Sequence, residues 1–188
     1  MNGNRAILTA VVLVVVIVAG WLLFRRTGGG ERVDLVAQFP TADKRGVSGS
    51  AAELADVQLA GETKRAIVIP PGPGNASRLI WKVRIPDDSW LRVSLGMKPE
   101  SWDQEGDGVL FRVGVSDGRS YDELFTQHVN AFANPAERRW IPVMVDLSAY
   151  AGEEVQIIFN TNSSPPKEKR DDPRNDHALW GAPEVIVR

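Results

Sequence analysis

Hydrophobic and polar residues alternate along most of the chain beyond residue 76. In one segment Val109, Phe111, Val113 and Val115 are expected on one face, with Arg112 and Gly114 on the other, and in another segment Leu79 and Trp81 alternate with Arg78. A period of two is typical of a β-strand that has one face on a core and the other in water. The same pattern recurs in further segments, at residues 79–85, 91–97, 143–147, 155–159 and 185–187. Strands are therefore expected to build most of this region.

Turn-forming residues separate these segments. Clusters of Pro, Gly and Asp lie at 70–74, 86–88, 116–118 and 151–152, and such clusters end strands. Further short candidates at 57–60, 66–69 and 121–129 bring the prediction to about eight or nine strands, with no long helix between them. For 121–129, a helical pairing of Glu123 with Gln127 is an alternative. The sequence predicts an all-β antiparallel β-sandwich, most simply a jelly roll. Before it, we expect a short helix at 33–39, limited by Pro40, and a loop at 41–54.

A long uncharged segment precedes this domain. Residues 6–24 contain no charged side chain, and as a helix they would extend about 28 Å, close to the hydrocarbon thickness of a bilayer. The sequence therefore predicts an N-terminal tail at 1–5, a transmembrane helix at 6–24, a Gly-rich linker at 25–32 and a β-sandwich domain at 33–188. A cleaved signal peptide is the alternative, but the apolar run continues past the weak cleavage candidate at 18–20.

The charges beside this segment decide its orientation only narrowly. Arg5 precedes it, and Arg25 and Arg26 follow it. Cytoplasmic flanks carry an excess of Lys and Arg, but long domains are exported largely regardless of charge. We expect a single-pass membrane protein whose C-terminal domain faces the periplasmic, extracytoplasmic side.

The composition excludes several classes of function. The chain has no cysteine, which excludes disulfides, thiol catalysis and cysteine-bound metals. Residues 33–188 contain 18 Lys and Arg against 23 Asp and Glu, so no nucleic-acid partner is expected. No G-x-S-x-G or Walker motif occurs, and His128 and His177 are too few for a zinc site. We therefore expect a protein that is not an enzyme.

One acidic loop leaves two interpretations open. Asp103, Glu105 and Asp107 occupy alternate positions next to Gly106 and Gly108. Calcium prefers six to eight oxygen ligands, often from loops of this kind, although this one lacks the pattern of an EF-hand. The loop is either a calcium site or a solvated turn, and no other cofactor is expected.

Two segments are candidates for binding. Trp102 lies in a predicted loop and is the tryptophan most expected to be exposed. The long polar stretch 161–176 contains four basic residues, Lys167, Lys169, Arg170 and Arg174. Loops of this length are often functional, so it is either a docking surface for a partner or a solvated loop.

Three motifs give the chain a resemblance to a known family. They are Gly-Asp-Gly-Val-x-Phe at 106–111, Arg-Trp-x-Pro-Val-x-Val-Asp-Leu-Ser-x-Tyr-Ala-Gly at 139–152 and Asp-x-Ala-x-Trp-Gly-x-Pro at 176–183. In this order they resemble galactose-binding-like, carbohydrate-binding-module-like jelly rolls of bacterial membrane-anchored proteins. The resemblance implies a ligand site either in the loops at one end of the sandwich or on a concave face with exposed aromatic residues.

These observations give three functional hypotheses. The leading one is a non-enzymatic, membrane-anchored interaction module, an accessory subunit that docks through its helix and sandwich on a larger membrane complex such as a respiratory or photosynthetic assembly. The first alternative is a carbohydrate- or envelope-binding module, with an exposed aromatic platform at Trp102, Tyr121 or Tyr150. The second alternative is a small hydrolase. The expected partners are the membrane through 6–24, a protein, and in the first alternative a glycan.

Overall fold

The computed structural model describes residues 32–46, 52–72, 76–163 and 174–187. The predicted tail, the transmembrane helix at 6–24 and the linker up to residue 31 lie outside the described residues. Within the described ranges, no helix combines the length and the hydropathy that crossing a bilayer requires.

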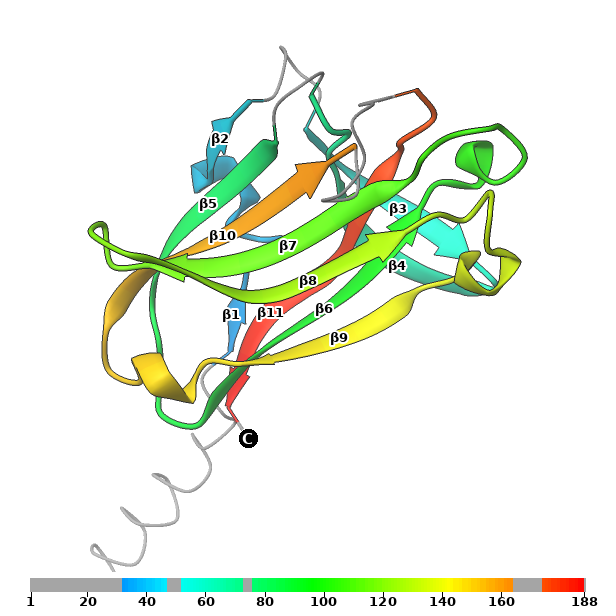
Figure 1. The fold of residues 1–188 in the computed structure, drawn as a ribbon. Helices are drawn as coiled ribbons and strands as arrows, with labels where there is room; N and C mark the ends of the chain where they lie inside the picture. The colour runs from blue at the N-terminus through cyan, green and yellow to red at the C-terminus, as the bar shows by residue number, and fades with distance from the viewer. Residues whose placement is uncertain (1–31, 47–51, 73–75, 164–173, 188) are drawn as a thin grey trace, which may run out of the picture. The chain divides into compact units, whose positions relative to one another are not determined.

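Two antiparallel sheets face each other and form a β-sandwich (Figure 1). The five-stranded sheet has the order β2 (Asp43–Arg45), β5 (Ser77–Arg84), β10 (Glu154–Asn162), β7 (Val109–Ser116) and β8 (Tyr121–Val129). The six-stranded sheet has the order β3 (Glu53–Leu59), β4 (Glu62–Val68), β11 (Ala178–Val187), β6 (Ser89–Met97) and β9 (Ile141–Asp146), and β1 (Val33–Asp34) also pairs with β11. The described helices are four 3-10 turns, at Phe39–Thr41, Pro99–Ser101, Pro135–Glu137 and Ser148–Tyr150. The expected all-β antiparallel sandwich is confirmed.

The first predicted elements differ from the structure. The helix expected at 33–39 is wrong, because Val33 pairs with Val185 as part of β1 and Leu35 is fully buried. A turn follows instead, in which the Asp34 carboxylate accepts hydrogen bonds from the amides of Val36 and Ala37 at 2.9 and 3.0 Å. The predicted loops were also too long, since 41–54 contains β2 and the start of β3, while 161–176 begins inside β10. Residues 121–129 form a strand, which rules out the helical alternative.

The main core between the sheets is centred on four aromatic rings. Phe159 of β10 lies between Trp81 and Trp180, with ring centroids 5.1 and 4.4 Å apart. Phe111 contacts Trp180 edge-on at 4.9 Å. The indole of Trp180 donates a hydrogen bond to the Thr161 hydroxyl at 3.0 Å, so its polar nitrogen is satisfied in the core. These residues alternate with outward ones, so the core fixes which side chains each strand presents to solvent.

A second, smaller cluster covers part of the outer face of the six-stranded sheet. Trp140 is 4% exposed and packs there with Leu59 and Leu179. Its indole nitrogen donates to the carbonyl of Glu62 at 2.9 Å. A Cβ atom on Gly181 would lie 2.7 Å from the Trp140 ring, closer than real contacts allow. The glycine is therefore required so that the ring can lie against the sheet.

We predict that Gly181→Ala lowers the free energy of unfolding by about 1–3 kcal/mol, because the added methyl displaces the Trp140 ring from its site. Chemical denaturation of the variant measures this. In a Trp140→Ala background the same change should cost less than about 0.5 kcal/mol, because the clash has gone. An equal loss in both backgrounds would mean that the ring contact does not explain the glycine.

Candidate ligand-binding face

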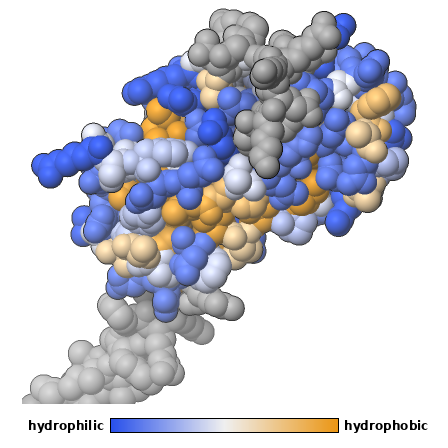
Figure 2. Space-filling model, viewed as in Figure 1, coloured by the Kyte–Doolittle hydropathy of each residue, from blue (hydrophilic) through white to orange (hydrophobic). Residues whose placement is uncertain are grey.

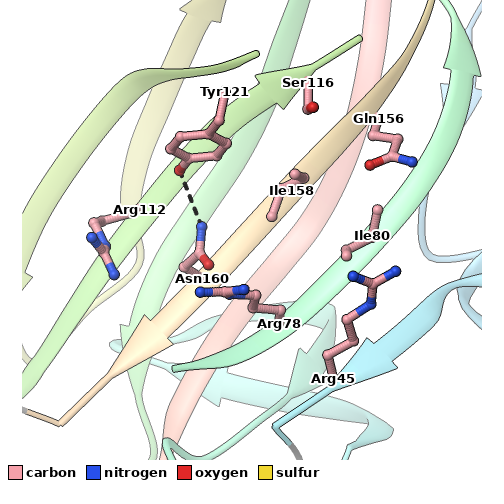
Figure 3. Close-up of a pocket in the computed structure, with 9 residues that line it drawn as sticks. All are labelled: Arg45, Arg78, Ile80, Arg112, Ser116, Tyr121, Gln156, Ile158 and Asn160. Atoms are coloured by element: carbon pink, nitrogen blue, oxygen red, sulfur yellow. Dashed lines mark hydrogen bonds between the residues drawn. The ribbon is translucent and has the colours of Figure 1, made fainter. Parts of the chain in front are cut away.

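The outer face of the five-stranded sheet carries a shallow pocket of about 270 Å³. Figure 3 shows the side chains that line it, which come from all five strands. They are Arg45, Arg78, Ile80, Arg112, Ser116, Tyr121, Gln156, Ile158 and Asn160. In the view of Figure 2, hydrophilic residues cover most of the surface, and hydrophobic residues form a band between β8 and β9. The apolar residues that line the pocket are Ile80 and Ile158. The pocket thus has an apolar floor and a polar border.

The strand register places the lining residues in rows that cross the sheet. In one row Arg45 pairs with Arg78, Arg78 with Asn160, and Asn160 with Arg112. In another row Gln156 pairs with Ser116, and Ser116 with Tyr121. Figure 3 accordingly shows the three arginines along one side of the pocket, with Tyr121 on the side facing them.

Tyr121 bridges the two rows. Its ring lies across Gly114, where a Cβ atom would be 2.4 Å from two ring carbons. Its hydroxyl accepts a hydrogen bond from the Asn160 amide nitrogen at 3.2 Å, and Asn160 itself is buried. Tyr121 nevertheless remains 46% exposed. An aromatic ring is therefore held against the sheet while part of its surface stays open to solvent.

The arginines give this face a local positive charge. Arg112 donates to the side-chain oxygen of Asn162 at 2.7 Å and lies 3.5 Å from Glu123. Arg45 pairs with Asp43, two residues before it, at 2.7 Å. For Arg78, no carboxylate of the described residues lies within ion-pair distance. The residues that line the pocket include no carboxylate and no imidazole.

Both tyrosines of the chain are shifted toward the neutral form. Burial raises the pKa of Tyr121 above its ordinary value of 10.0, and Glu123 raises it further, whereas Arg112 and Arg78 act in the opposite direction. Burial also raises the pKa of Tyr150, as does the hydrogen bond that its hydroxyl donates to Asp122 at 3.0 Å. The Tyr121 phenol is therefore uncharged at neutral pH.

Trp102 is not the exposed aromatic that we expected. Its ring is half-buried and packs against both hydrophobic clusters. Its indole nitrogen donates to the Met97 carbonyl at 3.0 Å, and its own carbonyl accepts from Arg138 at 2.6 Å. The expectation of exposure is therefore wrong at Trp102. Tyr150 is also half-buried, so among Trp102, Tyr121 and Tyr150 the exposed aromatic residue is Tyr121.

The acidic loop does not gather its carboxylates. Asp103 is exposed and lies 3.4 Å from Arg138. The carbonyls of Glu105 and Asp107 are occupied by side chains, since the Asn175 amide donates to the first at 2.9 Å and the His128 ring contacts the second at 2.7 Å. Across the described ranges, no three acidic or histidine side chains converge on a position for a metal ion. Calcium binding stays a prediction from the sequence.

The basic loop is only partly described. Lys167, Lys169 and Arg170 lie outside the described residues, and Arg174 is exposed at the border of the described part. The face that the structure assembles uses other basic residues, Arg45, Arg78 and Arg112. The alternation in two predicted strands already placed Arg78 and Arg112 opposite the core side. The three arginines lie close together because strands from distant parts of the sequence pair with one another. The alternation of polar and hydrophobic residues does not reveal which strands pair.

Comparisons with solved structures identify the fold. No protein-family model matches the chain. A CBM51 carbohydrate-binding module from Clostridium perfringens GH95, solved in complex with methyl-galactose, has a TM-score of 0.54 and 13% identity, covering 83% of this chain and 100% of that one. The ZmpB structure of the same organism, an M60 catalytic domain with two CBM51 domains, also has a TM-score of 0.54 and 13% identity, covering 77% of this chain and 14% of that one. The galactose-binding-like jelly roll is confirmed.

One curated relative matches part of the chain. An uncharacterized protein of Archaeoglobus fulgidus is 40% identical over 105 residues, which are 55% of this chain. The match spans about a quarter of the relative's length, 25%. It therefore assigns neither a family nor an activity.

We predict that both tyrosines titrate above pH 10 in the folded chain and near their ordinary pKa of 10.0 in denaturant. The tyrosinate absorbance of Tyr121→Phe would separate the two titrations, since the chain has 2 tyrosines. Because folding raises both pKa values, their contribution to stability is fully present below pH 10 and is lost as the pH rises through the folded-state values. A Tyr121 titration that denaturant leaves unchanged would contradict the described environment of its hydroxyl.

Proposed function

We propose that the chain is a carbohydrate-binding module that holds a glycan on the outer face of its five-stranded sheet. The observation that carries this proposal is Tyr121, whose ring lies across Gly114 in the pocket while the residue stays 46% exposed. An exposed aromatic ring fixed in one orientation is a surface on which a flat apolar ligand face can pack.

The surroundings of the ring suit a sugar. A sugar ring has C–H groups on its faces and hydroxyl groups around its rim. Beside Tyr121 lie side chains that can donate or accept hydrogen bonds, Ser116, Gln156 and Asn160, together with the three arginines. The floor contains Ile80 and Ile158. A concave site with an apolar surface and a few oriented polar groups is the usual arrangement for small ligands.

The lining favours binding over catalysis. Hydrolysis needs a general acid or base, or a nucleophile with its base. Ser116 is the serine among the lining residues, and its hydroxyl donates a hydrogen bond to the Ser120 carbonyl at 2.6 Å. The absence of carboxylates and imidazoles from the lining residues leaves it without a base inside the pocket. We therefore propose a non-enzymatic role, since the lining residues do not provide what a hydrolase needs.

The comparisons support the same class of function. The CBM51 module, which shares the fold across its whole length, is described as bound to methyl-galactose. At 13% identity this likeness concerns the fold, and function depends on the site that a fold carries. The carbohydrate-binding alternative thus has support from both the pocket and the fold, whereas no comparison concerns a membrane complex.

The membrane anchor belongs to the proposal as an expectation from the sequence. In this proposal residues 6–24 hold the module at a membrane, and the domain faces the extracytoplasmic side. A module held there would bring glycans of the envelope or of the surroundings to the cell surface. The accessory-subunit hypothesis stays a prediction that co-purification in mild detergent would test.

We predict that Tyr121→Ala weakens binding to a glycan recognised by the wild type by at least about tenfold, which corresponds to roughly 1.4 kcal/mol. A glycan array identifies the ligand, and calorimetry measures the affinity. Phe132→Ala is the matched control, because Phe132 is 41% exposed and does not line the pocket. It should leave the affinity unchanged.

Gly114→Ala tests the same platform without removing the ring. The added methyl would meet the Tyr121 ring at 2.4 Å and displace it from the sheet. We expect weaker glycan binding, while Tyr121→Phe, which keeps the ring and loses the contact with Asn160, should lose less. Wild-type affinity in both Tyr121→Ala and Gly114→Ala would rule out this face as the glycan site.

A further inference from the structure

Three arginines stand in a single row across the five-stranded sheet. Arg45 and Arg78 are direct partners on β2 and β5, and Asn160 on β10 separates Arg78 from Arg112 on β7. Neighbouring strands lie about 4.8 Å apart, so the row from β2 to β7 extends about 14 Å. The row is therefore long enough to contact more than one unit of an extended ligand.

This arrangement works against folding in the absence of a ligand. Like charges directly opposite each other on paired strands are destabilising. Asp43 and Glu123 offset Arg45 and Arg112 in part, but no described carboxylate pairs with Arg78. The chain as a whole has a formal net charge of −2, so the row does not follow from a generally basic composition. Repulsion of this kind, which lowers stability, is expected where a binding site needs the charges for its ligand.

We propose that the glycan held on this face is anionic, and that its acidic groups bind along the row Arg45, Arg78 and Arg112 while one of its sugar rings packs on Tyr121. This proposal rests on the proposed function and adds the chemical class of the ligand. A guanidinium group presents donors in a planar fork that matches a carboxylate or a sulfate. Neutral sugars offer no charged partner to offset the row.

The orientation of the ligand follows from the same register. The arginines lie on successive positions across the strands rather than along one strand, and Tyr121 is on β8 at the end of the sheet beyond β7. The Tyr121 ring reaches back over Gly114 of β7, and its hydroxyl contacts Asn160 in the arginine row. A ligand that contacts all three arginines must cross the strands over about 14 Å, which requires more than one sugar.

The experiment compares an acidic oligosaccharide with its neutral derivative. The full-length chain in mild detergent is titrated with oligogalacturonate and with the same oligomer after methyl esterification, which removes the charge and keeps the sugar backbone. We expect the acid to bind at least about tenfold more tightly, since hydrogen bonds to charged groups are the stronger kind. The preference should decrease as salt is added. A sulfated galactan oligomer in a third arm identifies which acidic group binds better.

Arg78→Gln and Arg84→Gln are the matched variants. Both residues are exposed arginines on β5, six positions apart, so Arg84 lies about 20 Å along the strand and outside the pocket. Arg78→Gln should reduce the preference for acid over ester to less than about threefold, and Arg84→Gln should keep it. Thermal unfolding of Arg78→Gln should be unchanged or shifted upward, because a repulsion has been removed.

The outcomes separate the two proposals. Equal binding of ester and acid, with loss of both in Tyr121→Ala, would overturn the anionic class and keep the glycan site. Tighter binding of a single-stranded oligonucleotide than of any glycan would overturn both proposals, as would an absence of glycan binding by the wild type. An acid preference that survives Arg78→Gln and is lost in Arg84→Gln would overturn the assignment to this row.

Discussion

The packing of Phe159 between Trp81 and Trp180 is the contact on which the rest of the structure depends. It holds β10 in the middle of its sheet and joins that sheet to β11 of the other one. Because side chains alternate along a strand, placing Phe159 inward places Asn160 on the outer side. A shift of one residue would bring the charged neighbours of these strands into the core. The core aromatic residues thus fix which side chains of these strands lie on the outer face.

Two aromatic side chains lie over glycines on the outer faces of the sandwich, and one of them is buried while the other is exposed. Trp140 lies over Gly96 and Gly181, is surrounded by aliphatic side chains and is 4% exposed. Tyr121 lies over Gly114, is bordered by Asn160 and arginines and is 46% exposed. The first ring closes the surface of its sheet and contributes to stability. The second ring is oriented by the same device but stays accessible, which is what a recognition surface needs.

The sequence predicted the fold well and the site poorly, for a physical reason. Period-two alternation is local, so it indicated the strands and the outward positions of Arg78 and Arg112. The row of arginines depends on the pairing of β2 with β5 and of β10 with both its neighbours, which no local pattern records. Arg45 falls in a predicted loop because β2, with three residues, is too short to show an alternating pattern. Trp102 is expected to be exposed because it lies in a predicted loop, and its hydrogen bond to the Met97 carbonyl leaves no sign in the sequence.

The position of the candidate site on a sheet, rather than in the loops, constrains its ligand. Loop carbonyls near Trp102 are already engaged, since Arg138, Asn130 and Asn175 donate to the carbonyls of Trp102, Gly106 and Glu105. On the sheet, backbone hydrogen bonds fix the spacing between strands, so side chains on neighbouring strands recur at about 4.8 Å. A binding face with such a fixed repeat is preorganised. It is complementary to a polymer that also presents its groups at regular intervals, and an acidic polysaccharide has both that regularity and the charge that the arginines require.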